Sequence, residues 1–381
     1  MKNEDTGLQS LPGLLKLQAT AVQGTRQQVQ AGSGQLRSIM SSRIVVRFHT
    51  LLFLGVFVLL SIVGLKLSFK IPVFLKMSPE PKRQSVTLDD GVHVYHLNFS
   101  RFQEEFPYLQ SYRCSLLYTP QPEDLGLSPI LLLAIKSHPR STSRRAAIRE
   151  TWAKQAEVMG YRLRPVFLMG LSDREQHMEI VKVEEEAYRD ILLWDFTEGH
   201  HNLSLKERCF LEWLHDNPQE ANFIFKGDDD LFVNPSSLVR YINENAPSPF
   251  QLHGALQRHS VVLRYSKYKI SYTLFPNAKY PYFLSGGGFL FSAALVRSLY
   301  QTSLRIPVFP LDDVYLGFLC LASNLTLRHN NLFYVFGLKF DPCNYQRALV
   351  VHRVESENLL QIWNQVQEAH CLTGPNIKFW G

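Results

Sequence analysis

The sequence predicts an α/β domain built on a mostly parallel sheet with flanking helices, and a single transmembrane helix near the N-terminus. The first observation is an alternation of apolar runs and amphipathic segments between residues 129 and 230, the order expected when helices cover a parallel sheet. The second is an uncharged apolar stretch at residues 50–65 with basic residues on both sides. A composition of 45% hydrophobic and 19% charged residues over 381 positions excludes a disordered or fibrous chain.

The charge and cysteine content exclude several functional classes. The 40 Lys and Arg residues face 34 Asp and Glu residues and form no dominant basic run. Because a nucleic-acid-binding protein usually concentrates its basic charge, we expect no nucleic-acid partner. The five cysteines contain no Cys-x-x-Cys pair, which argues against a zinc ribbon or a thioredoxin-like redox site. Since five is odd, at least one cysteine has no disulfide partner within the chain.

The apolar stretch predicts a transmembrane signal anchor at residues 48–70. An uncharged run of roughly 18 residues is close to the lower limit for a membrane-spanning helix. A cleaved signal peptide is the alternative, but no small-residue cleavage site follows the run. We expect residues 1–47, which are rich in Gln, Ser and Gly, to be a cytosolic tail. We expect residues 71–112, which contain four prolines, to be a stem.

The residues that follow the anchor carry the features of a secretory lumen. All five cysteines lie after it, in the compartment where disulfides form. Three N-glycosylation sequons also lie after it, beginning at Asn98, Asn202 and Asn324. The short span suits the thinner membranes of the early secretory pathway. These cues predict a single-pass type II protein of the Golgi membrane, with residues 113–381 forming a lumenal domain.

The elements of this domain follow one another in strand–helix order. An apolar strand at residues 129–135 precedes an Arg-rich amphipathic helix at residues 143–158. A second strand precedes a helix that begins at Ser172, where Glu175 completes a capping box. This second strand is at residues 165–170. The remaining predicted elements are the strands at residues 191–196 and 222–225 and the helix at residues 203–216.

The last of these strands runs into three consecutive carboxylates, Asp228, Asp229 and Asp230. They could be a solvated turn, because Asp favours turns and Gly227 precedes them. However, adjacent carboxylates repel one another between two apolar flanks unless a cation neutralises them. Hard oxygen ligands suit Mn²⁺ or Mg²⁺, and ligands bind beyond the carboxyl ends of parallel strands. The triplet therefore predicts a metal site that holds a diphosphate.

Four segments in order carry a family resemblance. With the aspartate triplet at their centre, they resemble the signature blocks of the β-1,3-glycosyltransferases of glycosyltransferase family 31, over roughly residues 130–371. The Pro342–Arg347 segment, Val351-His352-Arg353 and a helix with Trp363 look like the β-1,3-N-acetylglucosaminyltransferase branch. The four segments are residues 144–152, 225–234, 280–289 and 311–317.

The resemblance implies a lumenal GT-A catalytic domain that uses a UDP-sugar and Mn²⁺ and inverts the anomeric carbon. It implies that Asp228 and Asp230 bind the metal together with His352, although a lone histidine in an apolar strand is more often structural. It also implies that Asp229 contacts the ribose. Of the catalytic pair, Asp313 matches the general base and Asp312 a residue that positions the base or the acceptor. As a helix N-terminal pair they could instead only cap the helix.

Two further groups of residues are assigned to the substrates. Arg145 and Arg149 share one helical face and are expected to border the UDP site, beside Ile135, Lys136 and Ser137 at the end of the first strand. An exposed basic helix is the alternative. The acceptor is expected to contact four residues, since glycines admit a sugar ring close to the backbone and the flanking aromatic residues favour a carbohydrate platform. These four are Tyr282, Gly286, Gly287 and Gly288.

The chain departs from the family pattern near the expected donor and acceptor walls. Where relatives have Asp-x-Tyr before Asn-Leu-Thr, this chain has Glu198-Gly-His-His201 before Asn-Leu-Ser. Ser285 stands where a fourth glycine is often found. His200 and His201 are not expected to bind a metal, because adjacent loop residues seldom chelate one ion. The departures therefore bear on the choice of acceptor.

The expected activity is transfer of GlcNAc from UDP-GlcNAc in β-1,3 linkage onto galactose-terminated glycans of glycoproteins or glycolipids. β-1,3-Galactosyl transfer from UDP-Gal and a catalytically silent Golgi lectin or chaperone are the alternatives. Homo-oligomers or hetero-oligomers with other glycosyltransferases are compatible with this assignment. From the family pattern and pairing arithmetic we expect disulfides Cys114–Cys209 and Cys320–Cys343, leaving Cys371 free or available to a partner chain.

Overall fold

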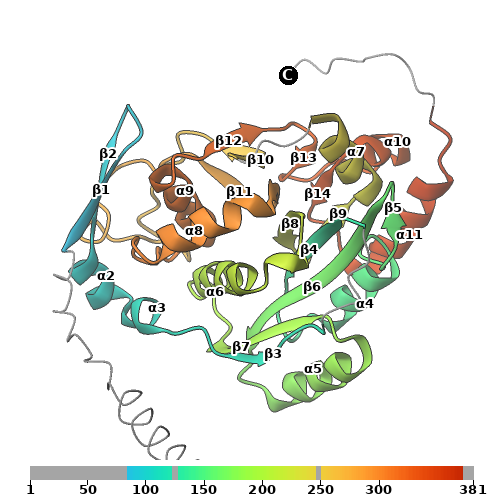
Figure 1. Ribbon diagram of the computed structural model, residues 1–381, viewed down its shortest axis with the longest axis horizontal. Helices are drawn as coiled ribbons and strands as arrows, with labels where there is room; N and C mark the ends of the chain where they lie inside the picture. The colour runs from blue at the N-terminus through green and yellow to red at the C-terminus, as the bar shows by residue number, and fades with distance from the viewer. Residues whose placement is uncertain (1–83, 122–127, 246–249, 372–381) are drawn as a thin grey trace, which may run out of the picture. The chain divides into compact units, whose positions relative to one another are not determined.

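A nine-stranded mixed sheet forms the centre of the computed structural model (Figure 1). The structure describes residues 84–121, 128–245 and 250–371, which belong to one compact unit. The strand order is β12-β10-β11-β8-β4-β6-β7-β3, with β5 paired to β6. The strands are β3 (Leu116–Tyr118), β4 (Ile130–Lys136), β5 (Glu157–Val158), β6 (Tyr161–Leu171), β7 (Ile191–Thr197), β8 (Phe223–Asp228), β10 (Gln251–Gln257), β11 (Phe283–Ser292) and β12 (Thr326–His329).

The middle of the sheet is parallel, as the strand–helix order predicts. Strands β8, β4, β6 and β7 run in one direction, and β11 and β3 flank them antiparallel. Every residue of β4 is buried, because a central parallel strand has helices over both of its faces. The carboxyl ends of β4 and β8 lie side by side, so that Lys136 pairs in register with Asp228. This register brings the predicted site residues of the two strands together.

Helices cover both faces of the sheet and enclose two apolar cores. Helices α6, α8 and α9 pack on one face, and α4, α5, α7 and α11 pack on the other together with a small sheet (Figure 1). The small sheet consists of β13 (Phe333–Tyr334), β14 (Val350–His352) and β9 (Leu231–Val233). The helices are α4 (Thr142–Glu150), α5 (Glu175–Tyr188), α6 (Leu203–Asp216), α7 (Pro235–Asn245), α8 (Val296–Ser303), α9 (Asp312–Ala322), α10 (Pro342–Arg347) and α11 (Ser356–Glu368), with the 3-10 turns η1 (Pro218–Glu220) and η2 (Ala293–Leu295).

The helix predicted at residues 143–158 is half as long as expected. Helix α4 ends at Glu150, and the last predicted residues form β5 instead. The reason is Trp152, which turns into the core and donates a hydrogen bond from Nε1 to the carbonyl of Leu231 over 2.9 Å. A buried indole needs such an acceptor, and the turn after α4 provides the approach to it.

The described part of the predicted stem is folded onto the rest of the compact unit. It contains the hairpin β1 (Ser85–Asp89) and β2 (Val94–Asn98), followed by α2 (Phe99–Glu105) and α3 (Pro107–Ser111). Tyr95 and Phe102 are fully buried in the same core as α9. Tyr95 stacks on Phe275 and meets Phe318 edge-on. Residues 84–112, the C-terminal part of the predicted stem, thus take part in the core.

Among the described residues, no helix is both long and apolar enough to cross a membrane. The predicted cytosolic tail at residues 1–47 and the predicted anchor at residues 48–70 lie outside the described residues. The same holds for the first part of the predicted stem.

Candidate active site

The structure brings the predicted metal ligands together. Asp228 ends β8, Asp230 follows it in the turn before β9, and His352 ends β14, where it pairs with Leu231 of β9. One ligand atom from each of Asp228, Asp230 and His352 lies within 4.8 Å of the other two. The three-stranded sheet is therefore what carries the histidine to the aspartate triplet.

The orientation of His352 is fixed by a second contact. Its Nδ1 lies 2.8 Å from the Val335 carbonyl, which requires a proton on Nδ1, and its Nε2 lies 3.1 Å from Oδ1 of Asp230. The hydrogen bond to Asp230 raises the pKa of His352. Burial would raise the pKa of Asp230, but the same hydrogen bond lowers it below its ordinary value. With Nδ1 protonated, Nε2 and the carboxylate need a proton or a metal cation between them.

Lys136 joins the metal-type cluster of Asp228, Asp230 and His352 to the predicted catalytic pair of Asp312 and Asp313. Its buried Nζ lies 2.9 Å from Oδ1 of Asp228 and 2.8 Å from Oδ2 of Asp312. Burial would lower the pKa of the ammonium group, but the two carboxylates raise it. One lysine at the end of β4 thus neutralises one carboxylate from each side of the site.

The two carboxylates that begin α9 have opposite environments. Burial opposes ionisation of Asp312, but the ammonium groups of Lys136 and Lys226 lower its pKa to about 2. Burial and the neighbouring Asp312 charge raise the pKa of Asp313 to about 7. Oδ1 of Asp313 accepts a hydrogen bond from the backbone N–H of Val314 over 2.8 Å. A buried carboxylate with a pKa near neutrality is suited to accept a proton.

A cleft of about 670 Å³ is lined by Lys136 and by Asp228 and Asp229 of the aspartate triplet. Asp229 lies on its wall, where its two oxygens accept hydrogen bonds from Ser137 Oγ over 2.8 Å and from Arg144 Nη1 over 3.2 Å. Polar and charged side chains dominate the remaining wall, which suits a ligand with phosphate and ribose groups. Its lining residues include Lys136, Ser137, Arg144, His200, Lys206 and Asp229.

Arg145 and Arg149 do not line the cleft, and Arg145 lies behind its wall, where Nη1 donates to Ser137 Oγ over 3.1 Å. Their place at a UDP site stays a prediction. The guanidinium group of Arg145 is fully buried and donates to both carboxylate oxygens of Glu184, over 2.8 and 2.6 Å. Arg149 forms a two-point pair with Asp190 and a third bond to Glu184. Their shared face of α4 packs against α5, where the arginines compensate buried carboxylates.

Arg144 is the arginine that lines the cleft. It comes one residue before Arg145, which turns it about 100° around the helix and toward Asp229 and Glu355. The residue pattern contained the signal, since three arginines lie within one helix. The residue pattern could not show which face of α4 points toward the sheet edge, because the orientation of α4 depends on how it packs on α5.

Lys206 and Glu198 form the base of the cleft, and the sequence assigned a functional role to neither. Lys206 Nζ donates to the Ser137 carbonyl and to Oε1 of Glu198, each over 2.7 Å. The same Glu198 oxygen accepts from the backbone N–H of Gly170 over 2.6 Å. Glu198 belongs to the segment that departs from the family pattern, so its position there was the available signal.

The other predicted contact residues divide into two groups. A Cβ atom on Gly286 would lie 3.2 Å from Lys136 Nζ, and one on Gly287 would lie 3.5 Å from the His352 ring, so both glycines border the site. Gly288 lies next to them with a φ of 146°. Ile135 and Tyr282 do not line the cleft. The Ile135 side chain is fully buried in the core, and Tyr282 lines a separate cavity of about 300 Å³ beside α9.

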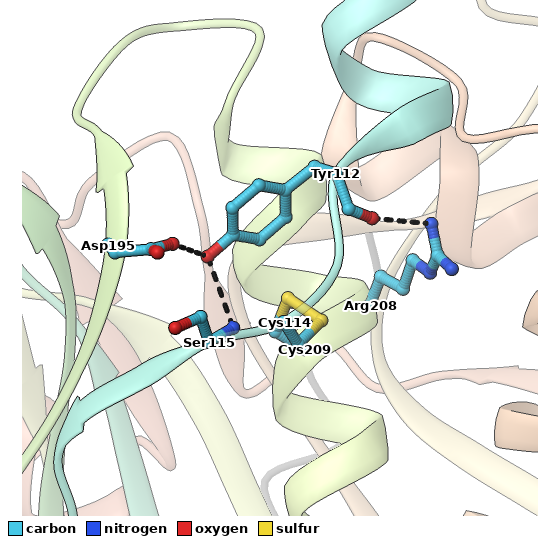
Figure 2. Close-up of a disulfide and its surroundings, with 6 residues drawn as sticks. All are labelled: Tyr112, Cys114, Ser115, Asp195, Arg208 and Cys209. Atoms are coloured by element: carbon cyan, nitrogen blue, oxygen red, sulfur yellow. Dashed lines mark hydrogen bonds between the residues drawn. A yellow bond between two sulfur atoms is a disulfide. The ribbon is translucent and has the colours of Figure 1, made fainter.

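One of the two predicted disulfides is confirmed. Cys114, just before β3, is bonded to Cys209 of α6, with a Cα–Cα distance of 5.4 Å. Figure 2 shows that Tyr112 lies beside this bond, with its hydroxyl directed at Asp195 and Ser115. The bond ties the chain before β3 to the helix that carries Lys206.

The prediction of a Cys320–Cys343 bond is wrong. Cys343 of α10 is bonded to Cys371, which follows α11, at a Cα–Cα distance of 5.6 Å. Cys320 is a free, buried thiol on the inner face of α9, within the α6–α8–α9 core. Burial raises its pKa well above the ordinary value. Helices α10 and α11 pack against each other, whereas Cys320 faces the opposite side of the sheet.

The three sequon asparagines lie at element ends. Asn98 caps α2 by accepting from Arg101 N, Asn202 precedes α6 and donates to the Thr197 carbonyl, and Asn324 is exposed after α9. Their glycosylation stays a prediction.

Comparison with known proteins agrees with this geometry. The family profile described as Galactosyltransferase matches residues 143–331. N-acetyllactosaminide beta-1,3-N-acetylglucosaminyltransferase 2 of Mus musculus is 33% identical over 293 residues, covering 73% of this chain and 71% of that protein. UDP-GlcNAc:betaGal beta-1,3-N-acetylglucosaminyltransferase 7 of Rattus norvegicus is 34% identical, covering 68% of each chain.

A third relative differs in the acceptor that its name gives. Acetylgalactosaminyl-O-glycosyl-glycoprotein beta-1,3-N-acetylglucosaminyltransferase of Homo sapiens is 35% identical over 254 residues, covering 62% of this chain and 66% of that protein. These matches, together with the carboxylate-rich cleft, define a glycosyltransferase. The chain belongs to the β-1,3-glycosyltransferases of glycosyltransferase family 31.

Proposed function

We propose that this protein transfers GlcNAc from UDP-GlcNAc in β-1,3 linkage onto a galactose-terminated glycan, with inversion at the anomeric carbon and with Mn²⁺ as cofactor. The observation that carries the proposal is Lys136, whose ammonium group contacts both Asp228 of the metal-type cluster and Asp312 of the catalytic pair. A donor diphosphate and an acceptor hydroxyl bound at these two groups would meet within one site. The three relatives described above are named as β-1,3-N-acetylglucosaminyltransferases, which supports the choice of donor.

The side chains of the metal-type cluster fit Mn²⁺. Asp228 and Asp230 offer carboxylate oxygens and His352 offers the Nε2 lone pair, a donor set that suits Mn²⁺. The Val335 carbonyl accepts a hydrogen bond from the opposite ring nitrogen of His352, a contact that fixes the tautomer and orientation of a ligating histidine. When bound there, the ion would neutralise charge on the diphosphate of the leaving UDP.

The remaining side chains have distinct roles in this scheme. Asp229, held by Ser137 and Arg144, would bind the nucleotide from the cleft wall. Asp313 would accept the proton of the galactose 3-hydroxyl as its oxygen bonds to the anomeric carbon and the bond from that carbon to UDP breaks. Asp312, kept ionised by Lys136, would position the acceptor. Its negative charge would also raise the affinity of Asp313 for the proton that Asp313 accepts.

The location of the enzyme is part of the same proposal. We assign a GT-A catalytic domain to the Golgi lumen, attached by the N-terminal anchor and glycosylated at the three sequons. Two disulfides in the described residues are in keeping with an oxidising lumen. The partners would be galactose-terminated glycoproteins or glycolipids, and other glycosyltransferases in oligomers.

A donor-by-acceptor array with the full chain tests the proposal. UDP-GlcNAc and UDP-Gal would each be offered with acceptors ending in galactose, N-acetylglucosamine or N-acetylgalactosamine, in the presence of Mn²⁺. We expect GlcNAc transfer to the galactose 3-hydroxyl, with a β linkage by NMR. The family profile carries the description Galactosyltransferase, so UDP-Gal is the second candidate donor. Turnover with UDP-Gal alone would select that candidate, and an α linkage would exclude the inverting scheme.

A further inference from the structure

A second polar groove lies away from the catalytic cleft. It has a volume of about 410 Å³ and lies between α7 and the paired strands β10 and β12 at the edge of the large sheet. None of its lining residues lines the catalytic cleft. Its cationic part is formed by Arg258, Arg328 and two histidines, and no Asp or Glu is among its lining residues.

The strand register explains how these groups meet. In the parallel β10–β12 pair, His253 stands opposite Arg328 and Gln251 stands opposite Thr326. Because side chains alternate between the faces of a strand, these four residues share one face, the face that α7 covers through Tyr241. Arg258 follows β10 directly, at the same end of the groove as His329.

The two guanidinium groups are not neutralised by the protein. Arg258 and Arg328 are both exposed, and neither has an ion pair or a hydrogen bond to its guanidinium group within residues 84–121, 128–245 and 250–371. Elsewhere in the same residues, buried arginines such as Arg145 are paired with carboxylates. Two unpaired guanidinium groups at one groove attract an anion, and each can bind two oxygens at once.

His253 supplies an independent indication of a ligand. It is only 4% exposed, its Nδ1 lies 2.7 Å from the Tyr241 hydroxyl, and its Nε2 has no hydrogen-bond partner among the described residues. In the tautomer in which the hydroxyl donates to Nδ1, one of the two that this contact permits, the ring proton sits on Nε2 and needs an acceptor. A buried donor without an acceptor is costly. His329 differs, because its two nitrogens contact Leu256 N and the Asn331 side chain.

We propose that this groove binds an oxyanion of the sulfate type, carried by a sugar of the acceptor glycan. The guanidinium groups of Arg258 and Arg328 bind its oxygens, and Nε2–H of His253 donates to one of them. The assignment to a glycan rests on the function proposed above. It is supported by position, since β10 adjoins the glycine-rich strand β11, and the segment that Arg258 begins reaches His200 at the catalytic cleft through Tyr268.

Calorimetric titration of the full chain, without donor, tests the proposal. The probes are a sulfated galactose-terminated disaccharide, the same disaccharide without sulfate, and sodium sulfate. The test variant carries Arg258→Gln and Arg328→Gln. Arg305→Gln is the control for loss of an exposed arginine, because Arg305 does not line the groove. Both variants lose positive charge at the surface, and thermal unfolding would verify that each of them is folded.

We expect the sulfated disaccharide to bind about ten-fold more tightly than the unsulfated one to the unsubstituted chain and to Arg305→Gln. In the double variant this advantage should disappear, with binding of the unsulfated sugar unchanged. Equal affinity for the two sugars in the unsubstituted chain, or a preference that survives in the double variant, would overturn the glycan proposal. If sodium sulfate binds to the unsubstituted chain and binds more weakly to the double variant, the groove is an oxyanion site even when the glycan proposal is overturned. Because no transfer is measured, these outcomes are independent of the donor-by-acceptor array.

Discussion

Nζ of Lys136 lies 2.8 Å from Oδ2 of Asp312, and this contact separates the properties of two adjacent carboxylates. The ammonium group keeps Asp312 ionised, and the charge of Asp312 in turn raises the pKa of Asp313. Since Lys136 also contacts Asp228, the electrostatics of the metal-type cluster and of the catalytic pair depend on the same side chain.

Asp230→Asn should nearly abolish Mn²⁺-dependent transfer while the domain remains folded. The amide has almost the same shape as the carboxylate but supplies no charge to the cation. Turnover at saturating UDP-GlcNAc and the thermal unfolding midpoint would be measured together. Asp216→Asn, which changes an exposed aspartate at the end of α6, should keep full activity. Full turnover of Asp230→Asn in Mn²⁺ would contradict the metal assignment.

Asp313→Asn should lower the transfer rate about 10² to 10⁴-fold and leave donor binding intact. The substitution removes only the group that accepts the acceptor proton. Among the described residues, the Asp313 side chain bonds to the backbone N–H of Val314 and not to Ser137 or Arg144, which hold Asp229 in the cleft. Steady-state kinetics and calorimetric titration with UDP would separate the two effects. An equal loss of UDP affinity would instead assign Asp313 to the donor or metal site.

The transfer rate should rise with pH up to about 7 and then level off. Burial and Asp312 raise the pKa of Asp313 to about 7, and a general base acts only when it is deprotonated. Below pH 7 the rate at saturating substrates and Mn²⁺ should therefore fall about ten-fold per pH unit. The residual rate of Asp313→Asn should not follow this profile. A rate that is constant between pH 5 and 7 would exclude Asp313 as the titrating base.

Arg144→Gln and Arg149→Gln should have different effects although the residues lie on the same helix. Arg144→Gln removes a cation and a hydrogen bond to Asp229 from the cleft, so UDP affinity should fall about ten-fold with little change in stability. Arg149→Gln leaves the buried Asp190 carboxylate without its arginine and leaves Glu184 with Arg145 alone, so the free energy of unfolding should fall by about 3 kcal/mol. Calorimetric titration and denaturant unfolding test both. The reverse pattern would support the assignment of Arg149 to the donor site.

Non-reducing peptide mapping should find a Cys343–Cys371 link and no link to Cys320. Cys371→Ser should lower the free energy of unfolding by about 3 to 4 kcal/mol, the loop-entropy value for a separation of 28 residues. Cys320→Ser is the control, since it should leave the disulfide map unchanged. A peptide that joins Cys320 to Cys343 would contradict the pairing described here.

Local patterns were sufficient for the strand–helix order and for the two aspartates of the metal-type cluster. The apolar periods of β4, β6, β7 and β8 and of α5 and α6 depend on neighbouring residues, which the sequence displays directly. The position of Asp228 at a strand end follows from the same reasoning, since a buried strand must stop where charge begins. His352 could be assigned only through the family resemblance, because its strand carries no local sign of a ligand.

Only the tertiary structure decided which side chains face the cleft. Arg144 and Arg145 are adjacent, and their separate roles follow from the packing of α4 against Glu184 of α5. In the same way, Cys343 pairs with Cys371 because α10 packs beside α11, while Cys320 faces the opposite core. Sequence periodicity defines the faces of a helix or strand, but the partner of each face lies far away in the chain. Long-range packing therefore sets the orientation of these side chains, whereas secondary structure depends on residues close in sequence.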